Sequence, residues 1–153
     1  MIGVISDTHG LLRPEAEAAL QGSELILHAG DIGDPAVIEA LERIAPVHAV
    51  RGNVDSQAWA SAFPETQFIQ HRDHAFYILH NIAQLDIDPA AAGIAMVVYG
   101  HSHRPLIEQR QGCIFFNPGS AGPRRFSLPI SVGRIYFGAG GPRAEVVNLE
   151  IES

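Results

Sequence analysis

Short apolar runs alternate with segments of helical spacing in the first third of the chain, and this alternation constrains the fold more than any other feature. Arg13–Gln21 is predicted to be helical, because Pro14 lies near its start and proline is favoured in the first turn of a helix. A second helix is predicted from Asp34 to Ile44, because Asp34 and Pro35 form an N-cap and first-turn pair. The alternation predicts parallel, buried strands with helices packed across them. The expected strands are Ile2–Ser6, Glu24–Ala29 and Val47–Val50.

The rest of the chain is rich in β-type runs. A hairpin is predicted to pair Thr66–Gln70 with Ala75–His80 and to turn near Arg72 and Asp73. Two sheets that face each other, with helices outside, would accommodate both parts of the chain. No repeat, charge block or low-complexity linker divides the 153 residues, so we expect a single domain over residues 1–153. The further strands are expected at Ile94–Tyr99, Leu106–Gln109, Cys113–Phe116, Ile130–Phe137 and Ala144–Ile151.

The composition limits the partners and the compartment of the protein. A net charge of −7 argues against a wide basic face for nucleic acid, so an acidic chain that handles phosphate would need metal ions as a local positive charge. Cys113 is the only cysteine, which excludes an intramolecular disulfide and fits a reducing compartment. The N-terminal run has no basic flank and is interrupted by Asp7, and Ala90–Tyr99 is too short to span a bilayer. We therefore expect a cytoplasmic protein without a membrane partner.

Polar side chains gather where the predicted strands end. The strand ends read SDTHG, HAGDIGD, RGNVD, a lone histidine after the hairpin, and YGHSHRP. In sheets with crossover connections, ligands bind outside the carboxyl ends of the strands. Five consecutive strands would thus bring metal-type ligands to one edge. These residues are Asp7, His9, Asp31, Asn53, His80, His101 and His103.

Each of these motifs is unspecific when taken alone. Asp-x-His can be a surface turn, Gly-Asp can be a helix cap, and a lone pair of histidines is more often structural than metal-bound. The ordered set of five is far more specific. Carboxylates and imidazoles together suit Mn²⁺, Fe or Zn²⁺ better than Mg²⁺ or Ca²⁺ alone. One carboxylate can bridge two cations about 3.5–4 Å apart, and Asp31, on the central strand of the series, is best placed to do so.

The order SDTHG, GD, GN, H and GHSH resembles the calcineurin-like metallophosphoesterase superfamily, and most of all its small YfcE-type phosphodiesterases. The later Asn117–Ser120, NPGS, followed by Pro123 and Arg124, is similar to a C-terminal signature of that subfamily. The resemblance runs over nearly the whole chain. It implies an α/β fold of mixed α+β character, namely a four-layer αββα sandwich of two mixed β-sheets flanked by helices.

The resemblance also implies a site with two divalent cations, Mn²⁺ first and Ni²⁺, Zn²⁺, Fe or Mg²⁺ as alternatives. A hydroxide that bridges the two metals would attack the phosphorus of a small phosphoester substrate. Asp31, Asn53 and His9 would be the catalytic residues, with Asn53 and His9 stabilising charge on the phosphoryl oxygens. One metal would be held by Asp7, His9, Asp31 and His103, and the second by Asp31, Asn53, His80 and His101.

The chain departs from this resemblance at two positions. Larger phosphatase families carry a histidine directly after the metal-binding asparagine, where it protonates the leaving oxygen, but this chain has Val54. General acid catalysis is typically worth about 10²–10⁴-fold, so its loss favours diesters with good leaving groups. Asp55 is then expected to be a turn residue or a support for the ligands. The family usually has glycine where this chain has Asn81, and the segment up to Gly100 is short, but we keep His80 as a ligand.

Several alternatives stay open at this stage. The same fold serves as a protein-interaction scaffold in a retromer subunit, and a phosphomonoesterase is also compatible with the ligand set. A nuclease is disfavoured, since no basic groove with interleaved aromatic residues is visible. The resemblance is compatible with a homo-oligomer, a dimer or larger. The sequence names neither the physiological substrate nor the native metal.

Overall fold

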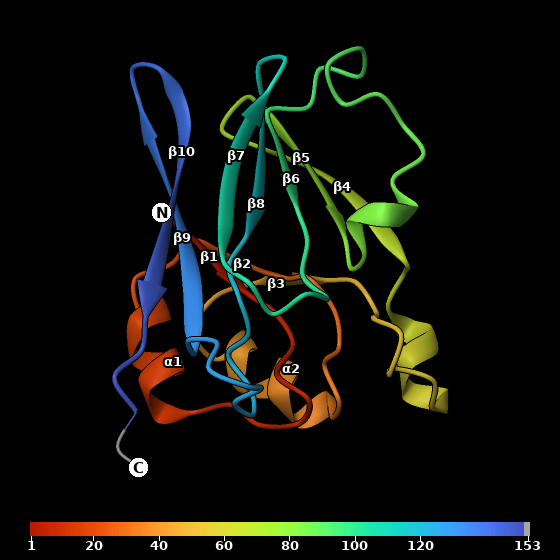
Figure 1. The fold of residues 1–153 in the computed structure, drawn as a ribbon, viewed down its shortest axis with the longest axis vertical. Helices are drawn as coiled ribbons and strands as arrows, with labels where there is room; N and C mark the ends of the chain where they lie inside the picture. Colours follow the sequence, from red (N-terminus) through yellow and green to blue (C-terminus); the bar gives the residue numbers. More distant parts are fainter. Residues whose placement is uncertain (152–153) are drawn as a thin grey trace.

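Two five-stranded β-sheets pack face to face in the computed structural model, which describes residues 1–151 (Figure 1). The strand order is β10-β9-β1-β2-β3 in the first sheet and β4-β5-β6-β8-β7 in the second. The first sheet contains β1 (Ile2–Ile5), β2 (Leu25–His28), β3 (Val47–Ala49), β9 (Ser131–Gly138) and β10 (Gly141–Asn148). The second contains β4 (Thr66–His71), β5 (His74–Leu79), β6 (Met96–Val98), β7 (Leu106–Arg110) and β8 (Cys113–Asn117).

The predicted strand–helix alternation is confirmed in the first sheet. Strands β1, β2 and β3 pair in parallel and are connected through α1 (Pro14–Leu20) and α2 (Pro35–Glu42). The Asp34 side chain accepts a hydrogen bond from the Ala36 N–H and so caps α2. Both helices bury apolar side chains against the outer face of this sheet, among them Leu20 and Leu41. The first helices therefore end close to where the sequence predicts, within two residues.

The second sheet begins with the predicted hairpin and has a thinner outer layer. Strands β4 and β5 are joined by Arg72 and Asp73, which have φ angles of 51° and 64°, as expected for a tight hairpin turn. Instead of α-helices, the 3₁₀ turn η2 (Ile82–Gln84) and the segment up to Ile94 cover its outer face. This segment is short and interrupted by Pro89, so a longer helix does not form there. The predicted sandwich of two mixed sheets is confirmed, with the α-helices on the first sheet and the turn η2 on the second.

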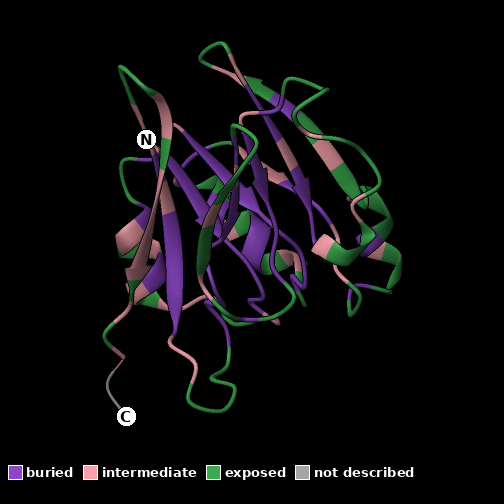
Figure 2. Ribbon diagram, turned by 45° about the horizontal axis from the view of Figure 1, so that its top comes forward, coloured by how far each residue is buried: buried purple, intermediate pink, exposed green. Residues whose placement is uncertain are grey.

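The main core lies between the two sheets (Figure 2). Ile2 and Ile135 from the first sheet meet Phe76, Met96 and Phe116 from the second, and all five are fully buried. This packing brings the strand ends of the two sheets together at one edge. A second 3₁₀ turn, η1 (Ala58–Ala62), connects β3 to β4. Among residues 1–151, no helix has the length and apolar character needed to cross a membrane.

Candidate metal centre

Asp7 presents one bare carboxylate oxygen to a cluster of histidines. Its Oδ2 accepts hydrogen bonds from Ser6 Oγ at 2.7 Å and from the His101 backbone N–H at 3.2 Å. Its Oδ1 is buried and has no hydrogen-bond partner within residues 1–151. This oxygen lies 3.3 Å from His103 Nε2 and 3.9 Å from the Nε2 atoms of His9 and His80. One oxygen is thus fixed by the protein and the other is available to a cation.

Asp31 is divided in the same way. Its Oδ1 accepts a hydrogen bond from the Val54 backbone N–H at 3.1 Å, while Oδ2 lies 3.2 Å from His80 Nε2 and 3.6 Å from His9 Nε2. Burial raises the pKa of Asp31, but the contacts with His80, the Val54 N–H and His9 outweigh it and lower the pKa to about 2. Asp31 is therefore an ionised carboxylate beside two imidazoles.

His80 is brought to the cluster despite the neighbouring Asn81. Its Nδ1 lies 2.8 Å from the Ala29 carbonyl oxygen, which can only accept, so Nδ1 carries the proton. Nε2 is therefore the nitrogen that faces the two aspartates, where it can carry a second proton or, in the neutral ring, offer its lone pair to a cation. Such a carbonyl contact is the usual way in which a metal-ligating histidine is oriented. Burial lowers the pKa of His80, but the nearby carboxylates of Asp31 and Asp7 raise it by more than burial lowers it. The net shift of the His80 pKa is therefore upward.

The remaining candidate residues surround this cluster at different depths. His9 is half-buried and His103 is buried, and their ring centroids are 5.5 Å apart. His101 is exposed, and its ring packs against His80 at 5.3 Å between centroids. Asn53 is exposed and lines a cavity together with His80. Ligand atoms within 4.8 Å of one another form two groups, Asp7 with His9 and His103, and Asp7 with Asp31 and His80.

Left-handed backbone conformations recur at these positions. A positive φ costs most L-residues on the order of 1 kcal/mol, and among non-glycine residues it is commonest at asparagine, aspartate and histidine. Such strained residues cluster at functional sites, where the surrounding fold imposes them. The loops thus hold the side chains in a specific arrangement. The residues are Asp7 (57°), His9 (47°), Asp31 (55°), His101 (73°) and His103 (64°).

Asp55 joins two of the loops that carry candidate ligands. Its buried carboxylate accepts hydrogen bonds from the backbone N–H groups of Ile32 at 3.0 Å, Gly33 at 2.9 Å and Gly52 at 2.8 Å. It therefore ties the loop after Asp31 to the turn that contains Asn53. The sequence left its role open between turn and support, and the contacts establish that it supports both loops. The only sequence signal for this role was the position of the Asp55 carboxylate, two residues after Asn53.

Asn117 anchors the loop that carries His101 and His103. Its side-chain amide donates to the Gly100 carbonyl oxygen at 3.0 Å and lies 3.1 Å from Ser102 Oγ. It also accepts from the Gly119 N–H at 2.9 Å. The first residue of the NPGS signature thus holds the loop of His101 and His103 in place. The sequence did not show this contact, because Asn117 is far from that loop along the chain.

The donor set fits divalent cations. Among residues 1–151, Asp7 Oδ1, His9 Nε2 and His80 Nε2 are buried atoms without a hydrogen-bond partner, and they face one another. A buried polar group left unpaired costs about 1–3 kcal/mol, so these atoms would gain from a bound cation. Carboxylate oxygens with imidazole nitrogens are the ligands expected for first-row divalent metals.

His28 precedes the Gly-Asp motif but is fully buried and has both ring nitrogens occupied. The Gly30 N–H donates to its Nδ1 at 3.1 Å, so Nε2 is protonated and donates to Thr8 Oγ1 at 3.0 Å. The Thr8 hydroxyl in turn donates a hydrogen bond to the Ile32 carbonyl oxygen. Burial lowers the pKa of His28 to about 4, even though Asp7 and other nearby charges oppose the shift. His28 is thus a structural, neutral residue.

This low pKa makes stability depend on pH. Between pH 6.5 and about 4 the unfolded chain binds a proton that the folded chain lacks, so acid destabilises the fold. The cost is at most about 1.4 kcal/mol per pH unit for one group. In urea unfolding of metal-free protein from pH 7 to pH 4, we expect His28→Gln to show a shallower loss of stability than the natural chain. Equal slopes for the two proteins would show that His28 does not titrate in this range.

Comparison with known proteins identifies the family of this chain. The family model of the calcineurin-like phosphoesterase superfamily domain matches residues 1–139. The probable metallophosphoesterase of Methanothermobacter thermautotrophicus is 33% identical over 141 residues, covering 84% of this chain and 81% of that protein. Phosphodiesterase YfcE of Escherichia coli strain K12 is 30% identical over 155 residues, covering 85% and 84% of the two chains.

Solved structures show the same fold. The crystal structure of Vps29 from Chaetomium thermophilum has a TM-score of 0.73 at 20% identity and covers 97% of both chains. At this identity the likeness concerns the fold alone, whereas the family model and the two relatives concern the sequence as well. The chain therefore belongs to the calcineurin-like phosphoesterase superfamily, in its YfcE-type branch.

Proposed function

We propose that the protein is a dinuclear-metal-dependent phosphodiesterase. One observation carries the proposal: two buried aspartates each direct a carboxylate oxygen at histidine nitrogens, and Asp7 Oδ1 has no other partner within the described residues. When bound, two divalent cations would stabilise charge on a phosphoryl group and lower the pKa of a water molecule that attacks phosphorus. The relatives named as phosphodiesterase and metallophosphoesterase support the same chemistry.

The proposed roles follow from position in the cluster. Asp31 Oδ2 lies 3.6 Å from His9 Nε2 and 3.2 Å from His80 Nε2, one histidine of each ligand set that the resemblance implies, so we assign Asp31 as the shared ligand. Asp7 Oδ1 also faces His9 and His80, and the resemblance alone keeps Asp7 in the first set. Asn53 and His9 lie at the accessible side of the cluster, where they would bind phosphoryl oxygens as well as metal. The two ligand sets remain those that the resemblance implies. They are Asp7, His9, Asp31 and His103 for one cation and Asp31, Asn53, His80 and His101 for the other.

Val54 supports a diester over a monoester substrate. Its side chain is 47% exposed next to the cluster and cannot transfer a proton, and its backbone N–H is already bonded to Asp31. The position where related phosphatases carry an acid is therefore aprotic here. A diester also carries less negative charge than a monoester dianion, so it needs fewer cationic partners. Phosphomonoesters would be the slower substrates.

A protein-interaction scaffold is the second candidate, because the fold is shared with Vps29. Two observations favour the enzyme. Every one of the seven ligand positions carries a residue that can bind metal, and three of the ligand atoms are buried without a partner within residues 1–151. A scaffold would not be expected to keep such a costly arrangement.

Metal removal and restoration test the proposal. Chelator-stripped protein should not hydrolyse bis-p-nitrophenyl phosphate, and Mn²⁺ should restore turnover, with Ni²⁺, Zn²⁺ and Mg²⁺ restoring less. The p-nitrophenyl phosphate monoester should be the poorer substrate at every metal. Thermal unfolding of the same samples should shift upward with metal, since a cation that binds only the folded state stabilises it. Failure of all four metals to restore hydrolysis of either ester would exclude the enzyme and leave the scaffold.

A further inference from the structure

A cavity of about 290 Å³ adjoins the candidate metal centre. Asn53 and His80 form the part of its wall nearest the metal centre, so a phosphoryl group bound there would direct one of its substituents into the cavity. The other walls come from the chain after β3, the start of β4 and the segment that contains η2. Ligand pockets usually measure about 300–1,000 Å³, so this cavity suits a small substituent.

The polar walls carry both donors and acceptors. Asn81 Oδ1 accepts from the Ala83 N–H at 3.0 Å, which leaves its amide NH₂ group available. Gln84 is exposed on η2 and contributes a second amide. Asn81 stands where the family resemblance implies glycine, so this wall is a feature of this chain. Because Asn81 also caps η2, the same residue places Gln84 at the cavity.

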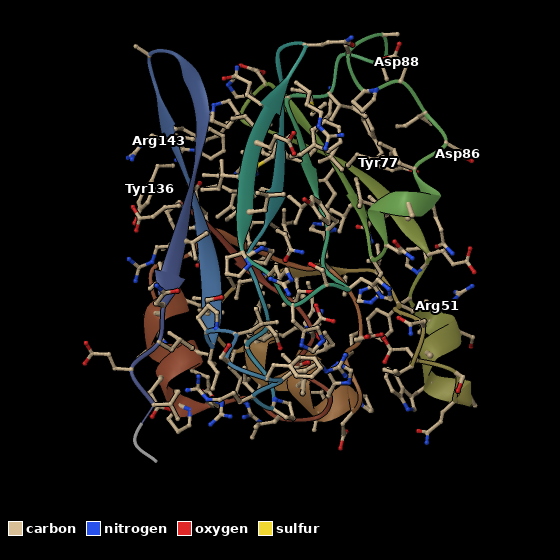
Figure 3. All side chains as sticks on the ribbon, in the orientation of Figure 1. Arg51, Tyr77, Asp86, Asp88, Tyr136 and Arg143 are labelled. Atoms are coloured by element: carbon tan, nitrogen blue, oxygen red, sulfur yellow. The ribbon has the colours of Figure 1, made fainter. Side chains whose placement is uncertain are left out.

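The charges of the cavity do not favour a second anion. Arg51 donates to the Phe63 carbonyl oxygen at 2.7 Å and to Glu65 at 3.2 Å, so its guanidinium is already paired. Asp86 adds a carboxylate, and Figure 3 shows Arg51 and Asp86 on the same side of the molecule, with η2 between them. The carboxylates Glu65 and Asp86 outnumber the single cation in the lining, so a further phosphate would be repelled.

The residues that line the cavity also argue against an aromatic or an aliphatic substituent. It contains no aromatic side chain other than the imidazole of His80, which faces the metal centre, so a nucleobase would find no stacking partner. Leu79 is the only aliphatic side chain among the lining residues, so a lipid chain would bury little apolar surface. Once anionic, aromatic and aliphatic substituents are excluded, the cavity suits a substituent that both donates and accepts hydrogen bonds. Hydroxyl groups do this, whereas carboxylates only accept.

We propose that this cavity binds the alcohol portion of the substrate, and that this alcohol is a small polyhydroxylated one, such as a glycerol- or sugar-type group. The carboxylates of Glu65 and Asp86 would accept hydrogen bonds from its hydroxyl groups, and the amides of Asn81 and Gln84 would donate to them. The proposal rests on the phosphodiesterase function above and narrows its substrate class.

Two matched diesters test it, namely glyceryl p-nitrophenyl phosphate and ethyl p-nitrophenyl phosphate. Both release the same p-nitrophenolate, so they differ only in the retained alcohol. With Mn²⁺-loaded protein we expect kcat/KM to be about tenfold higher for the glyceryl ester, because two ordinary hydrogen bonds together give roughly this factor. The difference should lie mainly in KM. Thymidine 5′-p-nitrophenyl phosphate should be no better than the ethyl ester.

Substitutions locate the effect in the cavity. Gln84→Ala and Asp86→Ala should each lower the glyceryl-to-ethyl ratio to about threefold, since each removes one hydrogen bond. Gln70→Ala is the matched control, because Gln70 is an exposed glutamine on β4 outside the cavity, and its ratio should stay at the natural value. An equal rate on the two diesters, a faster thymidine ester, or a ratio that the cavity variants leave unchanged would overturn the proposal. No hydrolysis of any diester would instead sink the phosphodiesterase function itself, and the cavity proposal with it.

Discussion

Asp31→Asn is expected to lower kcat by more than about a thousandfold, because losing cation stabilisation at phosphorus removes several kcal/mol. The hydrogen bond from the Val54 N–H to Oδ1 orients the side chain, so an asparagine would keep its carbonyl oxygen there. Its NH₂ group would then replace Oδ2, which lies 3.2 Å from His80 Nε2 and faces the candidate metal centre. A donor at this point repels a cation and also removes the negative charge that two cations would share.

The measurement combines turnover of bis-p-nitrophenyl phosphate with metal content per chain at saturating Mn²⁺. We expect the variant to lose at least one of the two proposed metals. Asp34→Asn is the matched control: it makes the same chemical change three residues away, at an exposed helix cap where asparagine serves as well as aspartate. That control should keep its metals and its rate. If Asp31→Asn retained two metals and a rate within tenfold of the natural chain, the assignment of Asp31 as the shared ligand would be wrong.

Gly52→Ala is expected to lower the free energy of unfolding by about 1–3 kcal/mol. We expect the free energy of metal binding to fall by a larger amount. An added Cβ at Gly52 would overlap the Asp31 carboxylate and its backbone nitrogen, and would lie 2.8 Å from Asp31 Cγ. A rotamer change cannot relieve this overlap, because backbone atoms are involved. The two loops would have to separate, which would lengthen the Val54 contact to Asp31 and the Gly52 contact to Asp55.

Urea unfolding of metal-free protein gives the stability change, and calorimetric titration with Mn²⁺ gives the affinity. Gly138→Ala is the matched control, since no atom lies within 4 Å of a Cβ built at Gly138, at the end of β9. The control should change neither quantity by much. Should Gly52→Ala match the control in both stability and Mn²⁺ affinity, the close approach of the two loops would not matter for the site.

The sequence predicted the elements well wherever the decisive signal was local. Apolar runs, proline at helix starts and the Arg72-Asp73 turn depend on neighbouring residues, and the strands, helices and hairpin were found there within a few residues. The outer layer of the second sheet was the main difference in detail. A family resemblance implied helices on both sides, whereas the short segment after His80 has room only for the turn η2 and irregular chain.

The candidate site divides in a similar way. The residue types and their order along the chain were enough to name seven candidate ligands, because each motif follows a strand end. The RGNVD stretch shows what was missing. The sequence suggested a ligand at Asn53, but not that Gly52 must lack a side chain to fit against Asp31. Nor did it show that Asp55 holds three backbone N–H groups of two loops.

By itself the sequence determined the sheet-rich fold, the identity of the candidate ligands and the absence of a proton donor at Val54. Only the tertiary structure decided which oxygen of each aspartate stays bare, which nitrogen of His80 is protonated, and what kind of cavity lies beside the site. The reason is physical. These properties depend on contacts such as His80 with Ala29, 51 residues apart, and His101 with Asp7, 94 residues apart. Such contacts form only when the two sheets pack together and bring their strand ends to one edge.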